Sequence, residues 1–509
     1  MVPVAVLVSA YPAIRPSALS AQCPDGSPPP CSRPVAAPPA TSLAVLYFDN
    51  LSGDSSDAYL ADGLTEEMIA RLGGIARLVV KSRTAVRRFR GRPPADPATL
   101  GRALGVAHLV SGSVRRAGTR LRVSVELVRA ASGSRLWGEQ YDRTDADLLA
   151  MEEDIARAVA TAIAGRLLPA ERASLASRPT NNPRAYELYL RGNHDLAMRT
   201  PSAAARAIRE YEAAWRLDSA FARALARAGF GYALFPAFPW PYPGLSEDTL
   251  LARSAAAIDR ALQVDSTCSD AWMAYGFILT LDPHNPFEVS QRAYERAVAL
   301  DPRNDEAWQL YGIQARGYGR DSIARAAMER ALELEPQRPI TLARLAELEW
   351  EQRRFAEASR LLDSAVAIDP EFYLAYWDRA LVRLSRNEPA AARQDGEAAV
   401  RLGAGDPLVQ LGLALVEAAT GDTGSARSRL AGFWSSGRDT LNPTPMDAVL
   451  SAQVLVALGE GDRAIAFVER VRKPLSWVWD LLRFPTFDAV RSTPRFQHLF
   501  AATRPQGIP

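Results

Sequence analysis

Between residues 305 and 400, small, aromatic and proline residues recur with a period of 34 residues. Counted from Asp305, the first copy has large residues at steps 4 and 7, small residues at steps 8, 20 and 27, and a proline at step 32: Trp308, Tyr311, Gly312, Ala324, Ala331 and Pro336. The second copy begins at Pro339 and the third at Tyr373. Small residues let two antiparallel helices approach closely, and proline ends the second helix because it cannot extend the hydrogen-bond ladder. The pattern predicts helical hairpins that stack on one another, since one hairpin alone cannot bury its apolar face.

This spacing resembles the tetratricopeptide repeat. Further copies are recognisable at residues 183–219, 222–266, 270–302, 408–430 and 447–471, and the last two carry a Gly-Asp turn followed by alanine. The resemblance implies an all-α superhelical solenoid of about eight repeats over residues 183–480. Residues 481–509 form a cap and tail, in which Phe487 and Phe496 are expected to close the last apolar face.

One insertion interrupts the array. Residues 235–245 read FPAFPWPYPGL, and the four prolines predict a loop rather than a helix. Two interpretations stay open for this segment: irregular packing against the solenoid, or part of a ligand-binding rim.

A different pattern covers residues 42–170. Short apolar runs at 42–48 and 78–80 predict buried strands, and helical spacing from Tyr59 to Leu72 predicts a helix ended by Gly73-Gly74. Asp96 is expected to cap a short helix that opens with Pro97 and closes at Gly105. Strict alternation then predicts strands at 108–115, 120–128 and 134–141, with one packed face and one wet face. A last helix is expected from Thr144, whose hydroxyl would cap it, to the residue before Pro169.

Four blocks of this segment resemble the TolB-like amino-terminal domain: SLAVLYFDNLSGD (42–54), YLADGLTEEMIARL (59–72), ALGVAHLVSGSVRRAGTRLRVSVELV (103–128) and LWGEQYDR (136–143). The resemblance implies an α/β domain, a mixed sheet with flanking helices, of interaction or sensory type and without catalytic residues. Such domains precede tetratricopeptide arrays in bacteria, often behind an adenylate cyclase, a serine/threonine kinase or a winged-helix regulator.

The amino terminus suggests export or tethering. Residues 1–22 hold a short apolar run and a small-residue cleavage site, which predicts a signal or membrane-tether segment; residues 23–41 are a proline-rich linker. Periplasmic or membrane-associated localisation is therefore expected, and the alternative is cytoplasmic. Outside the cytosol, Cys23 and Cys31 could close a small disulfide loop.

The net charge of +2 gives no general attraction to nucleic acid or membranes. Charge is nevertheless segregated: residues 49–67 contain six acids and no base, whereas residues 81–122 contain eleven bases and one acid. The candidate basic patch consists of Lys81, Arg83, Arg87, Arg88, Arg90, Arg115 and Arg116. We favour a solvated face, partly neutralised by the acidic helix, over a protein or lipid site. Nucleic acid is the least favoured partner, because only Phe89 interleaves with the bases as a stacking aromatic.

The function of the array is expected to lie on its concave face. In this repeat family steps 2, 5, 9 and 12 of the first helix face the groove, which selects Asp270, Met273, Phe277, Glu306, Gln309, Ile313, Arg316, Glu347, Trp350, Trp377, Leu381 and Leu384. About half of them are expected to be exposed. Their apolar and aromatic character with scattered charge suits an extended peptide or an amphipathic helix of a partner protein.

No catalytic or metal-binding motif is present. The sequence has no HExxH, phosphate-binding P-loop, G-x-S-x-G or paired CxxC motif, and its four histidines are scattered. We therefore expect a non-catalytic scaffold or sensory adaptor without a cofactor. The alternative is the carboxyl-terminal regulatory region of a kinase, an adenylate cyclase or a transcription regulator whose amino-terminal output domain is absent from this chain.

Overall fold

The computed structural model describes residues 38–505, except residues 53, 55–56, 82, 88, 92–95, 145–146, 177, 199, 239, 241, 283–284, 337, 404–405 and 472–475. The expected signal or tether segment at 1–22, most of the 23–41 linker and the Cys23–Cys31 pair therefore lie outside the described residues. Within the described residues, no helix combines the length and the apolar character needed to cross a bilayer.

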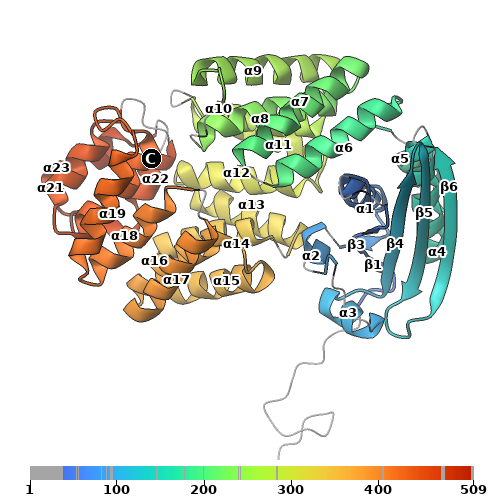
Figure 1. The fold of residues 1–509 in the computed structure, drawn as a ribbon, viewed down its shortest axis with the longest axis horizontal. Helices are drawn as coiled ribbons and strands as arrows, with labels where there is room; N and C mark the ends of the chain where they lie inside the picture. Colours follow the sequence, from blue (N-terminus) through green and yellow to red (C-terminus); the bar gives the residue numbers. More distant parts are fainter. Residues whose placement is uncertain are drawn as a thin grey trace, which may run out of the picture. The chain divides into compact units, whose positions relative to one another are not determined.

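Residues 42–176 form a mixed sheet with helices on both faces (Figure 1). Its strands are β1 (Ser42–Val45), β2 (Asp49–Asn50), β3 (Val79–Val80), β4 (His108–Ala117), β5 (Arg120–Arg129) and β6 (Arg135–Thr144). The order is β3-β1-β4-β5-β6, with β2 also paired to β4; pairs among β1 to β4 are parallel, and β4, β5 and β6 are antiparallel. The helices are α1 (Ala58–Gly73), α2 (Arg83–Arg87), α3 (Pro97–Leu104), α4 (Leu148–Ala164) and α5 (Pro169–Ala176).

Alternation along β5 decides which helices cover which face. Leu121, Val123, Val125 and Leu127 are buried in one cluster with apolar residues of α1 and α4, whereas Arg120 and Arg122 are exposed. The packed and wet faces predicted for this strand are confirmed. A smaller cluster on the sheet joins Ala44 and Leu109 to α2 and α3.

Helix ends in this domain follow the sequence signals in part. Asp96 accepts hydrogen bonds from the backbone of Ala98 and Thr99, and Gly105 ends α3 at a φ of 63°, as predicted. The predicted cap at Thr144 is wrong. Strand β6 extends through Thr144, whose hydroxyl donates to Asp147 at 2.7 Å, and α4 begins at Leu148. Pro169 does not stop a helix but opens α5, because proline fits the first helical turn.

Eight helical hairpins follow in the described part of the chain. Their first helices are α6 (Pro183–Ala197), α8 (Ala222–Ala237), α10 (Ser269–Leu279), α12 (Asp305–Gly317), α14 (Pro339–Glu351), α16 (Tyr373–Ser385), α18 (Val409–Ala419) and α20 (Pro445–Ala457). Their second helices are α7 (Pro201–Leu217), α9 (Glu247–Val264), α11 (Phe287–Leu300), α13 (Asp321–Leu334), α15 (Phe355–Ile368), α17 (Pro389–Leu402), α19 (Thr423–Ser435) and α21 (Gly461–Val468). Each helix packs on its hairpin partner, and separate apolar clusters follow one another along the array.

The prediction that residues 235–245 are entirely non-helical is wrong at their start. Helix α8 runs to Ala237 and includes Pro236, and the loop begins only at Phe238. Phe235 is buried and meets the rings of Trp240 and Tyr242 at centroid distances of 5.9 and 4.8 Å. These contacts favour the interpretation of irregular packing for this segment.

The chain ends in α22 (Ser476–Leu482), a short 3-10 helix η3 (Pro485–Phe487) and α23 (Pro494–Ala502). Phe487 and Phe496 lie 5.7 Å apart between ring centroids, in a buried cluster with residues of α20 and α21. These two phenylalanines therefore cover the last apolar face, as the sequence predicts.

Candidate functional site

The twelve predicted groove residues are much less accessible than expected. Six are buried: Met273, Gln309, Arg316, Glu347, Trp350 and Leu381. The other six are half-buried: Asp270, Phe277, Glu306, Ile313, Trp377 and Leu384. None is exposed, so the expectation that about half of them face solvent is wrong. The reason is tertiary, because these positions meet neighbouring repeats and distant parts of the same chain.

In the early repeats, the acidic groove positions are paired with arginines of α8. Arg227 on α8 lies 2.7 Å from the Glu306 carboxylate and 3.8 Å from that of Asp270, and Arg223 lies 3.0 Å from Asp270. Phe277 contacts Phe230 of α8, with ring centroids 5.0 Å apart. These side chains connect α8 to α10 of the next hairpin and to α12 of the hairpin after that.

In the later repeats, α22 and the residues just after it lie against the predicted groove. The α22 helix packs against both α12 and α20, whose sequences are separated by more than a hundred residues. Phe484 meets the ring of Trp350 at a centroid distance of 4.6 Å and lies 5.8 Å from the guanidinium of Arg316. The ring of Trp479 lies beside Gly319, where an added Cβ would come within 3.0 Å of it.

A buried cluster of charged residues surrounds this contact. Arg316 donates to Asp480 of α22 at 2.9 Å and to Glu347 of α14. Arg483 pairs with Asp321 at 2.9 Å and with Glu351. Burial raises the pKa of Asp480, and burial together with the charge of Asp480 raises the pKa of Glu351 to about 9. The site is therefore rich in carboxylates that are costly to ionise.

These contacts show what the sequence interpretation missed. Asp480 and Arg483 are the charged residues in the apolar stretch WVWDLLRF at 477–484. Charged side chains in an otherwise apolar helix require buried partners, and that signal was available. The sequence could not show that the partners lie more than 120 residues earlier, on α12, α13 and α14.

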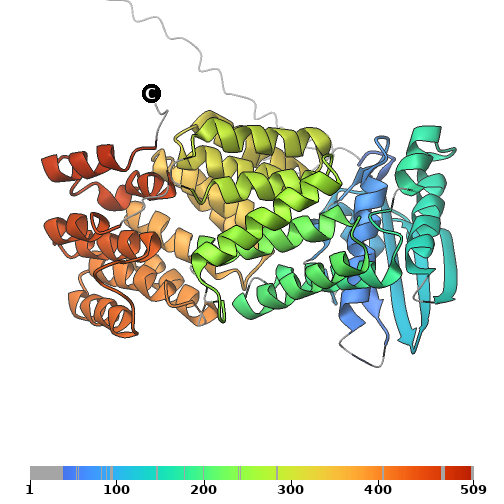
Figure 2. The same ribbon diagram turned by 90° about the horizontal axis from the view of Figure 1, so that it is seen from above.

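The second feature is the junction between the α/β domain and the first repeat. Helix α1 lies between the sheet and α6 in Figures 1 and 2. A single apolar cluster runs from Leu43 on β1 to Leu348 on α14. At Gly63 of α1, an added Cβ would lie 2.8 Å from the Leu190 side chain of α6, so glycine permits the close approach of the two helices.

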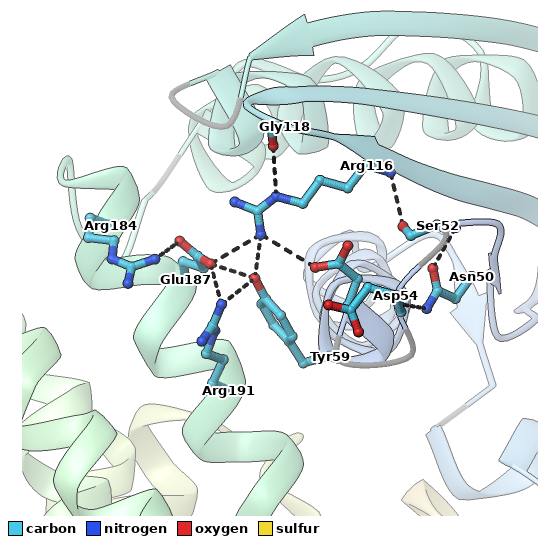
Figure 3. A network of polar contacts seen from close by, with 10 residues as sticks. Asn50, Ser52, Asp54, Tyr59, Arg116, Gly118, Arg184, Glu187 and Arg191 are labelled. Carbon is cyan, nitrogen blue, oxygen red and sulfur yellow. Dashed lines mark hydrogen bonds and ion pairs between the residues drawn. The ribbon is translucent and has the colours of Figure 1, made fainter.

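A network of polar contacts adjoins this apolar contact (Figure 3). The Tyr59 hydroxyl on α1 donates to Glu187 on α6 at 2.5 Å. Arg116, at the end of β4, donates to the Tyr59 oxygen at 2.8 Å and lies 3.3 Å from the Glu187 carboxylate. Arg191 lies 2.9 Å from the same carboxylate, and Arg184 also pairs with it. Glu187 therefore joins α6 to two separate parts of the α/β domain.

A third contact at the junction involves Asp62, which is buried on α1. Its carboxylate lies 2.8 Å from Nδ1 of His194 on α6 and 2.7 Å from the guanidinium of Arg90. The hydrogen bond that His194 donates to Asp62 raises the pKa of His194 above its ordinary value of 6.5, although burial opposes this.

The His194–Asp62 contact predicts a pH dependence of the junction. The pKa of His194 is raised in the folded chain, so its contribution to stability is complete below about pH 6.5 and is lost as the pH rises through the folded pKa. We expect the stability difference between the wild type and His194→Gln to shrink as the pH rises from about 6 to about 8. Thermal unfolding at a series of pH values measures it. A difference that stays constant, or that grows with pH, contradicts the prediction.

The predicted basic patch is largely engaged within the domain. Arg83 pairs with Glu66 of α1 at 2.8 Å, Arg90 with Asp62, and Arg116 belongs to the network around Glu187. Lys81 is half-buried and Arg115 is exposed. Arg88 and the side chain of Arg87 lie outside the described residues. The neutralisation of this face by the acidic helix, which the sequence favoured, is confirmed for Arg83 and Arg90.

Potential metal ligands are not clustered in the described residues. No group of three or more His, Cys, Asp or Glu side chains there could hold a metal ion. Cys268 is buried and free. Glu152 on α4 is fully buried and accepts from the Tyr186 hydroxyl at 3.0 Å; burial raises its pKa well above the ordinary range. This hydrogen bond connects α4 to α6, so the buried position of Glu152 is explained by a structural role.

Comparison with known proteins agrees with the repeat pattern. Residues 324–382 match the tetratricopeptide repeat family model. Two similar solved structures are those of human IFIT1 and yeast Tom70. The alignment with IFIT1 covers 64% of this chain and 84% of IFIT1, with 12% identity and a TM-score of 0.44. The alignment with Tom70 covers 71% of this chain and 80% of Tom70, with 13% identity and a TM-score of 0.39. The putative adenylate cyclase 3 of Rhizobium meliloti (strain 1021) is 36% identical over 163 residues, which are 32% of this chain. The aligned region spans 28% of that relative's length. The helical hairpins of this chain form a tetratricopeptide repeat array.

Proposed function

We propose that this chain is a non-catalytic adaptor or sensory protein that recruits another protein through its tetratricopeptide array. The observation that carries the proposal is the array itself, whose matched segment at 324–382 includes predicted groove positions on α14 and α16. Stacked hairpins present an extended concave surface, and such surfaces recognise peptides or helices of partner proteins. Each buried carboxylate described above, among them Glu152, Asp480 and Asp62, pairs with side chains of neighbouring elements. These contacts explain the carboxylates without a catalytic role.

We further propose that residues 42–170 are a TolB-like domain that acts together with the array. Four sequence blocks support this identity, and the mixed sheet with flanking helices is compatible with it. The apolar cluster that runs from β1 to α14 supports joint action, because a change in one part would alter the packing of the other.

Affinity purification from the native organism tests recruitment, followed by titration of each purified candidate against the intact chain. We expect saturable binding with a Kd of about 1 μM. Ile313→Glu places a charge on the half-buried concave side of α12 and should weaken binding at least tenfold. Arg360→Glu on α15, where the arginine side chain is 71% exposed, is the matched control and should leave binding unchanged. Circular dichroism must first show that both variants fold. Equal binding by the two variants contradicts recruitment through the concave face.

A second function is favoured by the relative named a putative adenylate cyclase. In this alternative the chain is the carboxyl-terminal regulatory region of a longer signalling enzyme. The supporting observation is 36% identity over 163 residues to a protein of which the match covers 28%. Immunoblotting of native extracts with an antibody to the array separates the two: a product much longer than 509 residues supports the alternative, and a product of this length contradicts it.

Export or membrane association through residues 1–22 stays part of the proposal. Cell fractionation of the native organism, with antibody detection, provides the test. Recovery of the protein only with cytoplasmic markers contradicts it.

A further inference from the structure

The starting observation is that part of the predicted groove has an occupant from the same chain. The residues Val478, Trp479, Asp480, Leu482 and Phe484 each expose 6% or less of their surface. On the array side Asp480 pairs with Arg316 and Phe484 contacts Trp350, and the repeat pattern assigns both of these array residues to the concave face. The occupant is thus an amphipathic segment with aromatic residues and one carboxylate.

The contact combines three kinds of recognition. Trp479 lies beside the turn at Gly319, whose φ of 63° favours glycine. Two guanidinium nitrogens of Arg316 each lie 2.9 Å from Oδ2 of Asp480. Phe484 packs on Trp350 and under Arg316. Together these features would recognise a tryptophan, an adjacent carboxylate and a phenylalanine four residues after the carboxylate.

The same contact leaves polar atoms unsatisfied. The Nε1 of Trp479, the Oδ1 of Asp480 and the Oε2 of Glu351 are buried without a hydrogen-bond partner, whereas the Oε1 of Glu351 pairs with Arg483. Arg483 forms ion pairs with Glu351 and Asp480, and these pairs offset part of the negative charge. A buried polar atom without a hydrogen bond loses its contacts with water and gains none in return, so this contact is less favourable than its buried area suggests. An occupant held in this way can be displaced by one that satisfies these atoms.

We propose that the concave face of α12, α14 and α16 binds an amphipathic helical segment of a partner protein, with a Trp-Asp-x-x-x-Phe-like pattern, and that residues 478–484 occupy this site in the free chain. The proposal rests on the proposed function and specifies the partner's chemistry. The resident segment acts as an intramolecular competitor. At a local concentration of about 1 mM, a segment with an intrinsic Kd of about 10 μM raises the apparent Kd of an external ligand about 100-fold.

A peptide with the sequence of residues 474–488, labelled with a fluorophore, tests the site in the full-length protein. Fluorescence anisotropy should show weak binding to the wild type. Trp479→Ala/Asp480→Ala weakens the resident segment and should bind the peptide at least tenfold more tightly. Adding Arg316→Gln to this variant should abolish the gain, because the peptide's carboxylate loses its partner. A peptide with Asp480→Ala should also lose the gain.

Several outcomes would overturn the proposal. A folded double variant that binds no peptide shows that the groove accepts no external segment. A wild-type protein that dimerises, as measured by light scattering, while the double variant stays monomeric shows that the site binds α22 of a second copy. If a native partner binds but is not displaced by the peptide, the proposed recruitment stands and this inference fails.

Hydrogen exchange of the wild type keeps the proposal testable if the double variant does not fold. Residues 478–484 should exchange through a local opening, at least tenfold faster than α12 and α14, which stay protected. Equal protection of the three segments would show that the resident segment is a permanent part of the core and would overturn the proposal.

Discussion

Replacing Glu187 by alanine is expected to lower the free energy of unfolding by about 1–3 kcal/mol, because the substitution leaves the buried hydroxyl of Tyr59 and the partly buried guanidinium of Arg116 without their acceptor. Arg116, Arg191 and Tyr59 all approach one oxygen of this carboxylate. Burial raises the pKa of Glu187, but hydrogen bonds from Tyr59 and Arg184 outweigh it and lower the pKa from 4.5 to about 2. The carboxylate therefore stabilises the fold above about pH 4.5, and this contribution is lost as the pH falls toward 2.

Chemical denaturation with urea measures this effect, and hydrogen exchange locates it on α1 and α6. Glu187→Gln keeps one acceptor oxygen and should lose less stability than Glu187→Ala. Glu357→Ala on α15 is the matched control, because that carboxylate is 39% exposed in a pair with Arg360. An exposed pair contributes about 0–1 kcal/mol. Equal losses at positions 187 and 357 would refute the assignment of the junction network.

Replacing Gly63 by leucine is expected to lower the free energy of unfolding by about 1–3 kcal/mol, as overpacked cores usually do. The new side chain would enter the space of Leu190, where even a Cβ would lie at 2.8 Å. The gain in helix propensity from removing a glycine, about 0.8 kcal/mol, opposes the effect without cancelling it. We expect the loss to be accompanied by faster exchange in α1 and α6.

Gly432→Leu provides the comparison for Gly63→Leu. Gly432 also lies within a helix, α19, but no heavy atom lies within 4 Å of the Cβ that a substitution would add. Here the propensity gain acts alone, so the protein should become more stable by about 0.8 kcal/mol. Destabilisation of both variants by the same amount would show that the loss at position 63 does not come from the close contact between α1 and α6.

The concave face illustrates where the repeat pattern misleads. Position within the repeat correctly predicted small residues between paired helices: an added Cβ at Gly312 would lie 2.6 Å from Met328 of α13. The same rule assigned Arg316, Glu347 and Trp350 to an open groove. Arg316 instead pairs with Asp480, Trp350 contacts Phe484, and Glu347 pairs with Arg316. A rule based on one repeat predicts contacts between neighbouring helices. It cannot predict that residues 478–484, near the end of the chain, pack against earlier repeats.

The junction had weaker signals in the sequence. The acids of residues 49–67 and the bases of residues 81–122 predicted mutual neutralisation, and Arg83–Glu66 and Arg90–Asp62 are such pairs. Glu187 resembled any other charged residue on the first helix of a repeat. Only its burial beside Tyr59 and Arg116 distinguishes it, and burial there depends on how α1 packs against α6.

The sequence by itself determined the local structure of this protein. Periodicity, prolines and glycines specify helical hairpins and an alternating strand because the relevant interactions join residues that are close along the chain. Tertiary structure alone decided that α1 packs on α6 and that residues 478–484 fill part of the concave face. These contacts join segments separated by more than a hundred residues, and they depend on complementary shape and charge that become defined only when both surfaces have folded.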